Sequence, residues 1–361
     1  MAVQDLSIVK SILSEFTHPT LYKNLIELDA LKKCELESDV LSIKLVMPFV
    51  WESAYLQLQQ QVSGKLLKET QAKSINWAIE YDIATLKRAN EQHAINNVKN
   101  IIVVSSGKGG VGKSSTAVNL ALALHKEGAK VGLLDADIYG PSVPTMLGTQ
   151  HEHPLTPDNK HMTPIMAYGL ATNSIGYLVE QDNAMVWRGP MASKALLQML
   201  QDTLWPDLDY LVIDMPPGTG DIQLTLAQSI PVTGSVIVTT PQDIALIDAK
   251  KGITMFNKVN IPTLGIIENM SYHICENCGH HEAIFGEGGA KQLATQYHTK
   301  LLAQIPLHRS LRQDLDSGKP TVVSQVDSPF SQIYCELADR VAAELYFQGK
   351  VILPDISFKA L

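Results

Sequence analysis

A glycine-rich segment between a predicted strand and a predicted helix restricts the fold more than any other feature of the chain. Residues 107–114 read GKGGVGKS and satisfy the pattern G-x-x-x-x-G-K-[ST]. The β-branched run Ile101–Val104 precedes the segment, and apolar residues at helical spacing follow it from Lys113. Glycines in this setting let successive backbone N–H groups and a helix N-terminus face a phosphate. We therefore expect a nucleotide-phosphate loop at the end of a buried strand.

The residue types of this loop suit the charge of a nucleotide and its metal ion. Lys113 is expected to neutralise oxygens of the β- and γ-phosphates, and the Ser114 hydroxyl is expected to ligate Mg²⁺. Strand, loop and helix occur in the required order, which makes a chance glycine-rich turn a poor alternative. The positions expected to contact ATP are Gly107, Lys108, Gly109, Gly110, Val111, Gly112, Lys113, Ser114 and Ser115.

From residue 98 onward the chain alternates short strands with turns and helical segments. This alternation is typical of a doubly wound, mostly parallel α/β sheet, whose ligands lie at the carboxyl ends of the strands. We therefore expect residues 98–361 to form a P-loop NTPase domain. The further strands expected in it are Val131–Leu134, Tyr210–Ile213, Ser235–Thr239 and Thr263–Ile267.

Residues 1–80 differ from the rest and predict a separate small α+β domain. Helical periodicity and short apolar runs alternate there, and a mixed, polar stretch at residues 81–97 is the expected linker. The helices expected are Ser7–Glu15 and Trp51–Glu69, and the strands expected are Ile26–Cys34 and Val40–Val46.

Composition narrows the class of protein. The 361 residues are 45% apolar and 18% charged, which suits a globular protein with a sizeable core. The net charge of −8 argues against nucleic acid or an anionic membrane as a partner. No apolar run approaches the ~20 residues that span a bilayer, and the first residues lack a secretory pattern. Four cysteines do not form a disulfide framework, so we expect a cytoplasmic protein.

A second lysine, Lys108, directly follows the first glycine of the loop. Its ammonium group is poorly placed to contact the phosphates that Lys113 neutralises, and better placed to act across a dimer interface, as arginine fingers do. The run KGGVGKS resembles the deviant Walker A family, which includes Min-type division ATPases, ParA-type partition ATPases, the nitrogenase iron protein and Mrp/ApbC-type iron–sulfur carriers. The resemblance implies a homodimer enclosing two nucleotides, with Lys108 and Lys113 as catalytic residues.

Three acidic residues end predicted strands near the loop. Asp135 and Asp137 follow one strand, and Asp214 ends the apolar run before a Gly/Pro-rich segment, Met215–Asp221. The resemblance implies that Asp137 orients the attacking water as a catalytic residue, that Asp135 supports the Mg²⁺ shell, and that Asp214 holds Mg²⁺ through water. The Met215–Asp221 segment is suited to a switch that senses the γ-phosphate. By the same resemblance Asn269 recognises adenine, and Ile305-Pro306 completes the base pocket.

The second informative motif is the pair Cys275 and Cys278, two residues apart, with Gly279 able to form a tight turn. A [4Fe–4S] cluster or a tetrahedral zinc needs about four ligands, and only two thiols are clustered here. A symmetric homodimer would bring two pairs around one bridging cluster. Two alternatives remain open: zinc held within one chain by the two cysteines with His280 and His281, and a redox-active pair in the manner of thioredoxin.

Several stretches taken together resemble the Mrp/ApbC-type (also Nbp-type) iron–sulfur carrier ATPases from about residue 98 to the C-terminus. The C-terminal residues 345–361 are expected to be short and extended, unlike the amphipathic membrane helix of Min-type ATPases. The N-terminal part resembles the small domain of iron–sulfur assembly factors, but lacks the Cys-Pro often found there. The stretches that carry the main resemblance are Ser105–Ser115, Asp135–Pro144, Trp187–Met191, Asp214–Asp221, Asn269–Cys278 and Phe285–Gly289.

The resemblance implies a function in which ATP, Mg²⁺ and a [4Fe–4S] cluster meet in one homodimer. Cys275 and Cys278 of both copies would hold a labile cluster and pass it to apo-proteins, with slow ATP hydrolysis coupled to the transfer. The partners implied are iron–sulfur client proteins and cluster scaffold proteins, without nucleic acid or membrane. The alternatives are a ParA/MinD-type positioning ATPase and a nucleotide-binding protein with a structural zinc.

Overall fold

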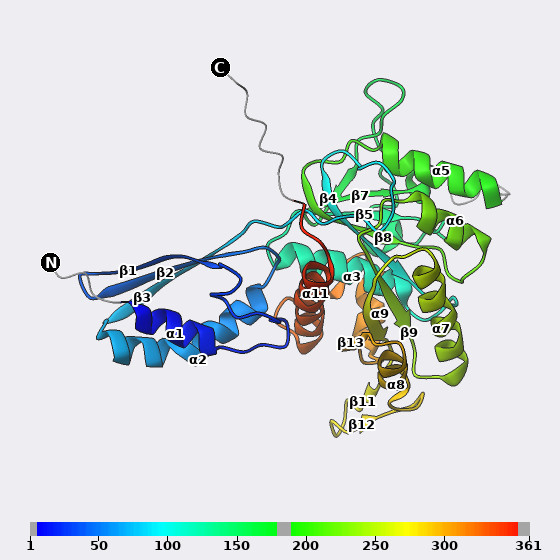
Figure 1. Ribbon diagram of the computed structural model, residues 1–361. Helices are drawn as coiled ribbons and strands as arrows, with labels where there is room; N and C mark the ends of the chain where they lie inside the picture. Colours follow the sequence, from blue (N-terminus) through cyan, green and yellow to red (C-terminus); the bar gives the residue numbers. More distant parts are fainter. Residues whose placement is uncertain (1–5, 179–188, 353–361) are drawn as a thin grey trace, which may run out of the picture.

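The computed structural model describes residues 6–178 and 189–352, and its main body is an eight-stranded sheet covered by helices on both faces (Figure 1). The strand order is β13-β10-β9-β4-β8-β5-β7-β6, and every neighbouring pair is parallel except β6 with β7. The strands are β4 (Val98–Ser105), β5 (Val131–Asp135), β6 (Ile165–Ala167), β7 (Leu170–Ser174), β8 (Leu208–Asp214), β9 (Gly234–Thr239), β10 (Thr263–Glu268) and β13 (Lys300–Gln304).

The strand β4 explains the two layers of helices. Its residues alternate between two separate cores, with Ile102 and Val104 in one and Ile101 and Val103 in the other. Such a strand is buried on both faces, as a central parallel strand requires. The helices are α3 (Lys113–Lys126), α4 (Val143–Met146), α5 (Gly189–Asp202), α6 (Asp221–Ser229), α7 (Asp243–Lys258), α8 (Gly289–Gln296), α9 (Arg309–Asp316), α10 (Thr321–Ser324) and α11 (Pro329–Gln348), with a 3₁₀ turn at Ile175–Tyr177.

The predicted α/β class is confirmed, and the order of the strands places β4 at the middle of the sheet with its phosphate loop at the carboxyl edge. In the part of the chain that the structure describes, no helix is both long and apolar enough to cross a bilayer. A two-stranded hairpin, β11 (His273–Ile274) with β12 (His281–Glu282), projects beyond α8 at the edge of the molecule (Figure 1).

The N-terminal domain is a three-stranded sheet with two helices on one face (Figure 1). The strand β2 pairs antiparallel with β1 and parallel with β3, and alternate residues of β2 are buried. Apolar side chains at this period belong to a half-buried strand, whose inner face here meets the helices. The elements are α1 (Ser7–Glu15), β1 (Leu31–Glu37), β2 (Val40–Met47), α2 (Glu52–Thr70) and β3 (Ser74–Tyr81).

Some boundaries differ from those expected. The first strand begins at Leu31 rather than Ile26, because residues 26–30 form a hydrogen-bonded turn with Asp29 at positive φ. The strand β3 was not expected, and it ends at Tyr81, one residue into the expected linker. Residues 82–97, all of them described, form neither a helix nor a regular strand. Residues 345–361 were expected to be extended, and this prediction is wrong at the start of the segment, because α11 continues to Gln348. Residues 353–361 lie outside the described residues. Trp187 and Arg188, two of the residues that carry the resemblance, also lie outside them.

Buried carboxylates join the two domains. At the N-terminus of α2, the backbone N–H of Ser53 donates to Glu127 Oε2 at 2.7 Å. The backbone N–H of Ala54 donates to Asp339 Oδ2 at 3.1 Å. Glu127 ends α3, the helix that begins at the phosphate loop, and Asp339 lies in α11. Acceptors at a helix N-terminus satisfy N–H groups that have no partner within the helix. The N-terminal domain is therefore bonded directly to the far end of the phosphate-binding helix.

We predict that Asp339→Asn makes the protein more stable at pH 8, by about 1–3 kcal/mol. Burial, and next the charge of Glu127, raises the pKa of Asp339 well above its usual value, and Oδ1 of Asp339 has no donor. A carboxyl group whose folded pKa is raised stabilises the fold below its unfolded pKa and loses that contribution as the pH rises through the folded pKa. The asparagine amide carries no charge at any pH, and its NH₂ group can donate to the neighbouring Glu127 carboxylate as the protonated carboxyl group does.

The measurement is urea unfolding of both proteins from pH 4 to pH 8. The stability difference should be largest at pH 8 and shrink toward pH 4, where Asp339 of the parent protein is itself protonated. The exposed Asp207→Asn serves as the control and should show no such trend. A stability difference that does not change with pH would contradict the assignment.

Candidate functional site

The phosphate loop has the geometry that its sequence predicts. It links β4 to α3, with Gly110 and Gly112 both at φ +80°, where residues with a Cβ are strained. Gly107 packs so closely on α7 that a Cβ there would lie 2.2 Å from the carbonyl of Asp248. The side chain of Asn269 fixes the loop from the opposite side, because its Nδ2 donates to Val111 O at 2.9 Å. The loop is thus held from two elements distant in sequence.

The two lysines of the loop lie in different surroundings. Lys113 is buried, with Nζ 2.5 Å from Asp214 Oδ1 and 3.1 Å from Ser114 Oγ. Lys108 is half-exposed, and its Nζ makes no hydrogen bond or ion pair with any residue that the structure describes. A flexible ammonium group without a partner in its own chain is available to a second molecule.

The predicted acidic residues come together at the carboxyl edge of the sheet. Asp135 and Asp214 end the neighbouring strands β5 and β8 and lie directly opposite each other in the register. Asp135 accepts from Ser174 Oγ at 3.0 Å and from two backbone N–H groups, those of Asp137 and Val143. Burial, and next the charge of Asp214, raises the pKa of Asp135 to about 7. Burial also raises the pKa of Asp137, which is half-exposed beside the loop.

The donor set at this edge fits Mg²⁺. Oδ2 of Asp214 is buried and has no hydrogen-bond partner, which is costly for a carboxylate oxygen unless a cation lies nearby. The Lys113 ammonium group is hydrogen-bonded to both the Ser114 hydroxyl and Asp214. Hydroxyl and carboxylate oxygens are hard ligands of the kind that Mg²⁺ prefers. Asp135 is less suited, since both of its oxygens already accept hydrogen bonds.

The Gly/Pro-rich segment after Asp214 touches the phosphate loop. The backbone N–H of Gly218 donates to Ser106 O at 2.9 Å, and Ser106 Oγ donates to Lys108 O at 2.9 Å. A change in the loop around the phosphates would therefore reach this segment through two successive hydrogen bonds.

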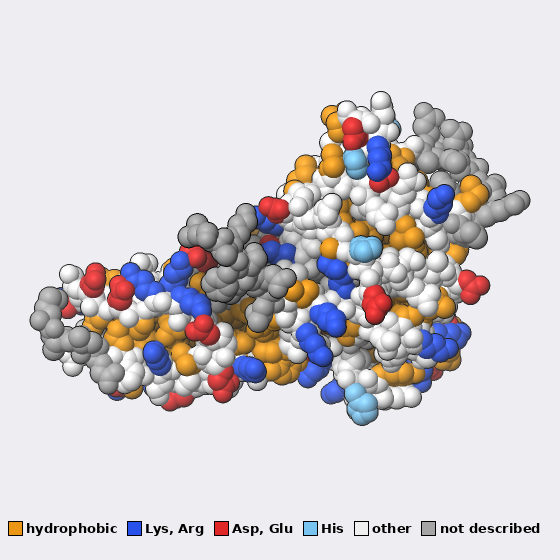
Figure 2. Space-filling view, turned by 45° about the horizontal axis from the view of Figure 1, so that its top comes forward, with side chains coloured by type: hydrophobic (Ala, Val, Ile, Leu, Met, Phe, Trp, Pro, Cys, Tyr) orange, Lys and Arg blue, Asp and Glu red, His pale blue; other side chains and the backbone are white. Residues whose placement is uncertain are grey.

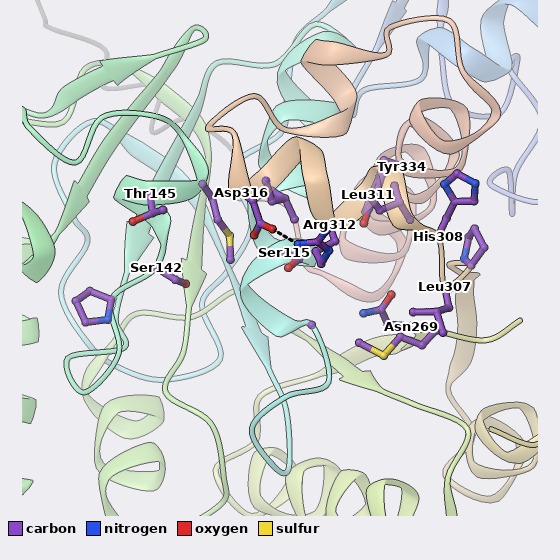
Figure 3. Close-up of a pocket in the computed structure, with 16 residues that line it drawn as sticks. Ser115, Ser142, Thr145, Asn269, Leu307, His308, Leu311, Arg312, Asp316 and Tyr334 are labelled. Carbon is purple, nitrogen blue, oxygen red and sulfur yellow. Dashed lines mark hydrogen bonds and ion pairs between the residues drawn. The ribbon is translucent and has the colours of Figure 1, made fainter. Parts of the chain in front are cut away.

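A cavity of about 430 Å³ opens beside the end of the loop (Figure 3). Asn269 and Leu307 line one side of it, and Ser142 and Thr145 face them across it (Figure 3). Its residues are Gly112, Ser115, Pro141, Ser142, Thr145, Met146, Asn269, Met270, Pro306, Leu307, His308, Leu311, Arg312, Leu315, Asp316 and Tyr334. Apolar walls with a few polar groups suit a nucleoside base and ribose.

The cysteine pair lies in the turn of the β11–β12 hairpin. Cys275 N donates to His280 O and Gly279 N donates to Cys275 O, both at 2.9 Å, and Gly279 has φ +71°. Cys275 is half-buried and Cys278 is exposed. Backbone N–H groups of Cys278 and Asn277 lower the pKa of the Cys275 thiol, which favours the thiolate that binds metal.

The surroundings of the hairpin bear on the two alternatives for the cysteines, a zinc site within one chain and a redox-active pair. His281 stacks on Tyr272, with ring centres 5.0 Å apart, and across the described residues no three His, Cys, Asp or Glu side chains are grouped so as to hold a metal ion. In this arrangement the described residues do not present the two cysteines, His280 and His281 as one grouped ligand set. The pair also precedes a short strand rather than opening a helix, unlike the redox-active arrangement.

Comparison with known proteins identifies the family of the chain. Residues 97–342 match the ParA family model described as NUBPL iron-transfer P-loop NTPase. The iron–sulfur cluster carrier protein of Escherichia coli strain K12 is 68% identical over 355 residues, covering 98% of this chain and 96% of that protein. The chain belongs to the Mrp/ApbC iron–sulfur carrier family. This confirms the resemblance identified from the motifs.

More distant members extend the likeness. The mouse iron–sulfur cluster transfer protein NUBPL is 50% identical over 257 residues, covering 71% of this chain and 80% of that protein. A solved nucleotide-binding protein from Archaeoglobus fulgidus in complex with ADP is 36% identical, with a TM-score of 0.58, and covers 66% of this chain and 93% of that chain. Sequence and structure therefore both support the assignment of this chain as a P-loop NTPase.

Part of the cavity was not expected from the sequence. Arg312 and Asp316 form an ion pair of 2.6 Å on α9 at the cavity (Figure 3), and Tyr334 reaches it from α11. No local motif marks these residues, because their positions depend on how α9 and α11 pack on the sheet. Pro306 lines the cavity as expected, whereas Ile305 is buried and is not among its lining residues.

Proposed function

We propose that the protein is an ATP-dependent iron–sulfur cluster carrier that works as a homodimer in the cytoplasm. Cys275 and Cys278 of the two copies would together hold one labile [4Fe–4S] cluster, received from scaffold proteins and passed to apo-proteins. The observation that supports this most directly is an exposed hairpin with two thiols per chain, attached to a P-loop domain of the carrier family. A transferable cluster needs ligands at the surface, and four thiolates need two chains.

The nucleotide site would act as a slow switch. Lys113 and the loop N–H groups would bind the phosphates, while Ser114 and Asp214 would hold Mg²⁺, which neutralises phosphate charge when bound. Asp137 would orient the attacking water, and Lys108 would enter the site of the partner subunit. Asn269 would contact the adenine, since it already lies at the cavity. Closure of the dimer around ATP would bring the two hairpins into their working positions.

The alternative of a positioning ATPase has less support. The relatives described above carry cluster-carrier names, and a ParA-type function would require a continuous basic face. Figure 2 shows basic and acidic side chains interspersed over the face in view. A structural zinc is the other alternative, and it is distinguished by experiment.

Anaerobic reconstitution with iron and sulfide should give one cluster per two chains. A [4Fe–4S] cluster absorbs broadly in the visible range, whereas zinc has a filled d shell and is colourless. Absorption and metal content are measured on the gel-filtered protein, together with its mass in solution. A colourless protein that retains only zinc would refute cluster carriage and support the structural-zinc alternative.

A further inference from the structure

The segment that carries the cysteines leaves the body of the protein and returns to it at one buried carboxylate. Residues 269–288 connect the end of β10 to the start of α8 and include the whole hairpin. Glu268, only 1% exposed, is the last residue of β10. Its Oε1 accepts from Ser271 Oγ at 2.6 Å, and its Oε2 accepts from Ala290 N at 3.1 Å. One side chain therefore holds both ends of the cysteine-bearing segment.

The same carboxylate is also bonded to the strand that leads to the nucleotide cavity. Gln304, the last residue of β13, donates from Nε2 to Glu268 Oε1 at 2.8 Å and to Ser271 Oγ at 3.0 Å. The three side chains form a closed triangle of hydrogen bonds. Hydrogen bonds within such a network polarise and strengthen one another. The network therefore fixes the relative positions of the elements that supply its side chains.

The residues that follow the triangle are walls of the cavity. Asn269 comes directly after Glu268, and Pro306 comes two residues after Gln304; both line the cavity (Figure 3 labels Asn269). Backbone hydrogen bonds tie the second wall to the entry of the hairpin: Ser271 N donates to Ile305 O at 2.9 Å, and Leu307 N donates to Tyr272 O at 2.7 Å.

Further contacts continue this connection into the hairpin itself. His273, the first residue of β11, bridges to Leu307 as in a parallel ladder, and its Nδ1 lies 3.2 Å from Leu307 O. A second hollow, lined by His273, Ile284, Leu307, His308, Arg309 and Arg312, lies between the hairpin and the cavity. Leu307, His308 and Arg312 line both hollows, so the cavity and the second hollow are adjacent.

We propose that Glu268 is a positioning residue that couples occupancy of the nucleotide cavity to the placement of Cys275 and Cys278. A nucleotide that orders Asn269 and the wall from Pro306 to His308 would stiffen the triangle, and through it both ends of the cysteine segment. The inference rests on the proposed function and adds the route by which nucleotide regulates the cluster. It assigns no contact between Glu268 and either ligand.

The test measures the rate at which reconstituted protein loses its cluster to a chelator, with and without a non-hydrolysable ATP analogue. Couplings between two sites in one protein are typically about 5–150-fold, so the analogue should change the rate of the unsubstituted protein at least about fivefold. In Glu268→Gln the amide group faces one of the hydrogen-bond donors, and the analogue should change the rate less than about twofold. Both proteins should still bind the cluster and the analogue.

A second variant keeps the test decisive if the buried substitution impairs folding. Gln304 is exposed, so Gln304→Ala removes two sides of the triangle without opening a core cavity. It should also reduce the effect of the analogue to less than about twofold. Gln292→Ala, an exposed glutamine on α8 outside the triangle, is the matched control and should keep the full effect.

The outcomes separate this inference from the proposed function. If the unsubstituted protein binds cluster and analogue but its loss rate does not respond to the analogue, the coupling is refuted and carriage stands. If Gln304→Ala responds as fully as Gln292→Ala, the triangle is not the route and the inference is overturned. If the unsubstituted protein takes up no cluster, the proposed function fails, and the inference fails with it.

Discussion

Replacing both Cys275 and Cys278 by alanine is expected to abolish cluster binding, while the variant binds ATP as the cluster-free unsubstituted protein does. The two thiols lie in the turn of a hairpin that contributes no residue to the phosphate loop, and no third ligand is grouped with them among the residues that the structure describes. Because each copy loses both of its hairpin thiolates, all four ligands of the bridging cluster are removed. The two thiols share no contact with the ATP site, so their substitution by itself should not alter ATP binding when no cluster is present.

The measurement is visible absorption and bound iron after anaerobic reconstitution, with ATP affinity measured on the same proteins before reconstitution, when all are free of cluster. Cys34→Ser is the control, because Cys34 is a half-buried thiol in β1 of the N-terminal domain, and it should retain the full absorption. Each single variant, Cys275→Ala and Cys278→Ala, should also lose stable binding. Normal absorption in the double variant would mean that the cluster is held elsewhere.

Lys108→Ala is expected to reduce the rate of ATP hydrolysis by about 10³–10⁵-fold while ATP still binds, as when an arginine finger is removed. The binding groups remain, since Lys113 and the loop N–H groups are untouched. The ammonium group of Lys108 has no partner within the described part of its own chain, which leaves its charge for the site of a second copy. Steady-state hydrolysis and equilibrium ATP binding are the two measurements, with the exposed Lys291→Ala on α8 as the control.

Mixing two inactive variants shows in which chain Lys108 acts. Lys108→Ala binds ATP but lacks the catalytic lysine, while Lys113→Gln keeps Lys108 but lacks the phosphate-binding lysine. If Lys108 acts across the interface, a mixed dimer contains one complete site, and part of the activity returns. If Lys108 acts within its own chain, the mixture stays as inactive as either variant alone.

The phosphate loop and its surroundings were the most predictable part of the protein. A strand, a glycine-rich turn and a helix N-terminus are adjacent in the chain, so their spacing fixes their geometry. The cysteine pair was predictable for the same reason, since two ligands on one turn need no distant contact. The N-terminal strands were less predictable. Ile26 lies in a turn rather than in a strand, and β3 (Ser74–Tyr81), which ends one residue into the expected linker, was not expected.

The sequence by itself determined the chemistry of two half-sites: a phosphate loop with a second lysine at Lys108, and a thiol pair at Cys275 and Cys278 that lacks two ligands. Only the tertiary structure decided how these half-sites are connected. It pairs Asp135 with Asp214 across neighbouring strands, brings α9 to the nucleotide cavity, and bonds both ends of the cysteine segment to Glu268. Local patterns specify local geometry, whereas contacts between distant residues follow from the order in which strands pack in the sheet.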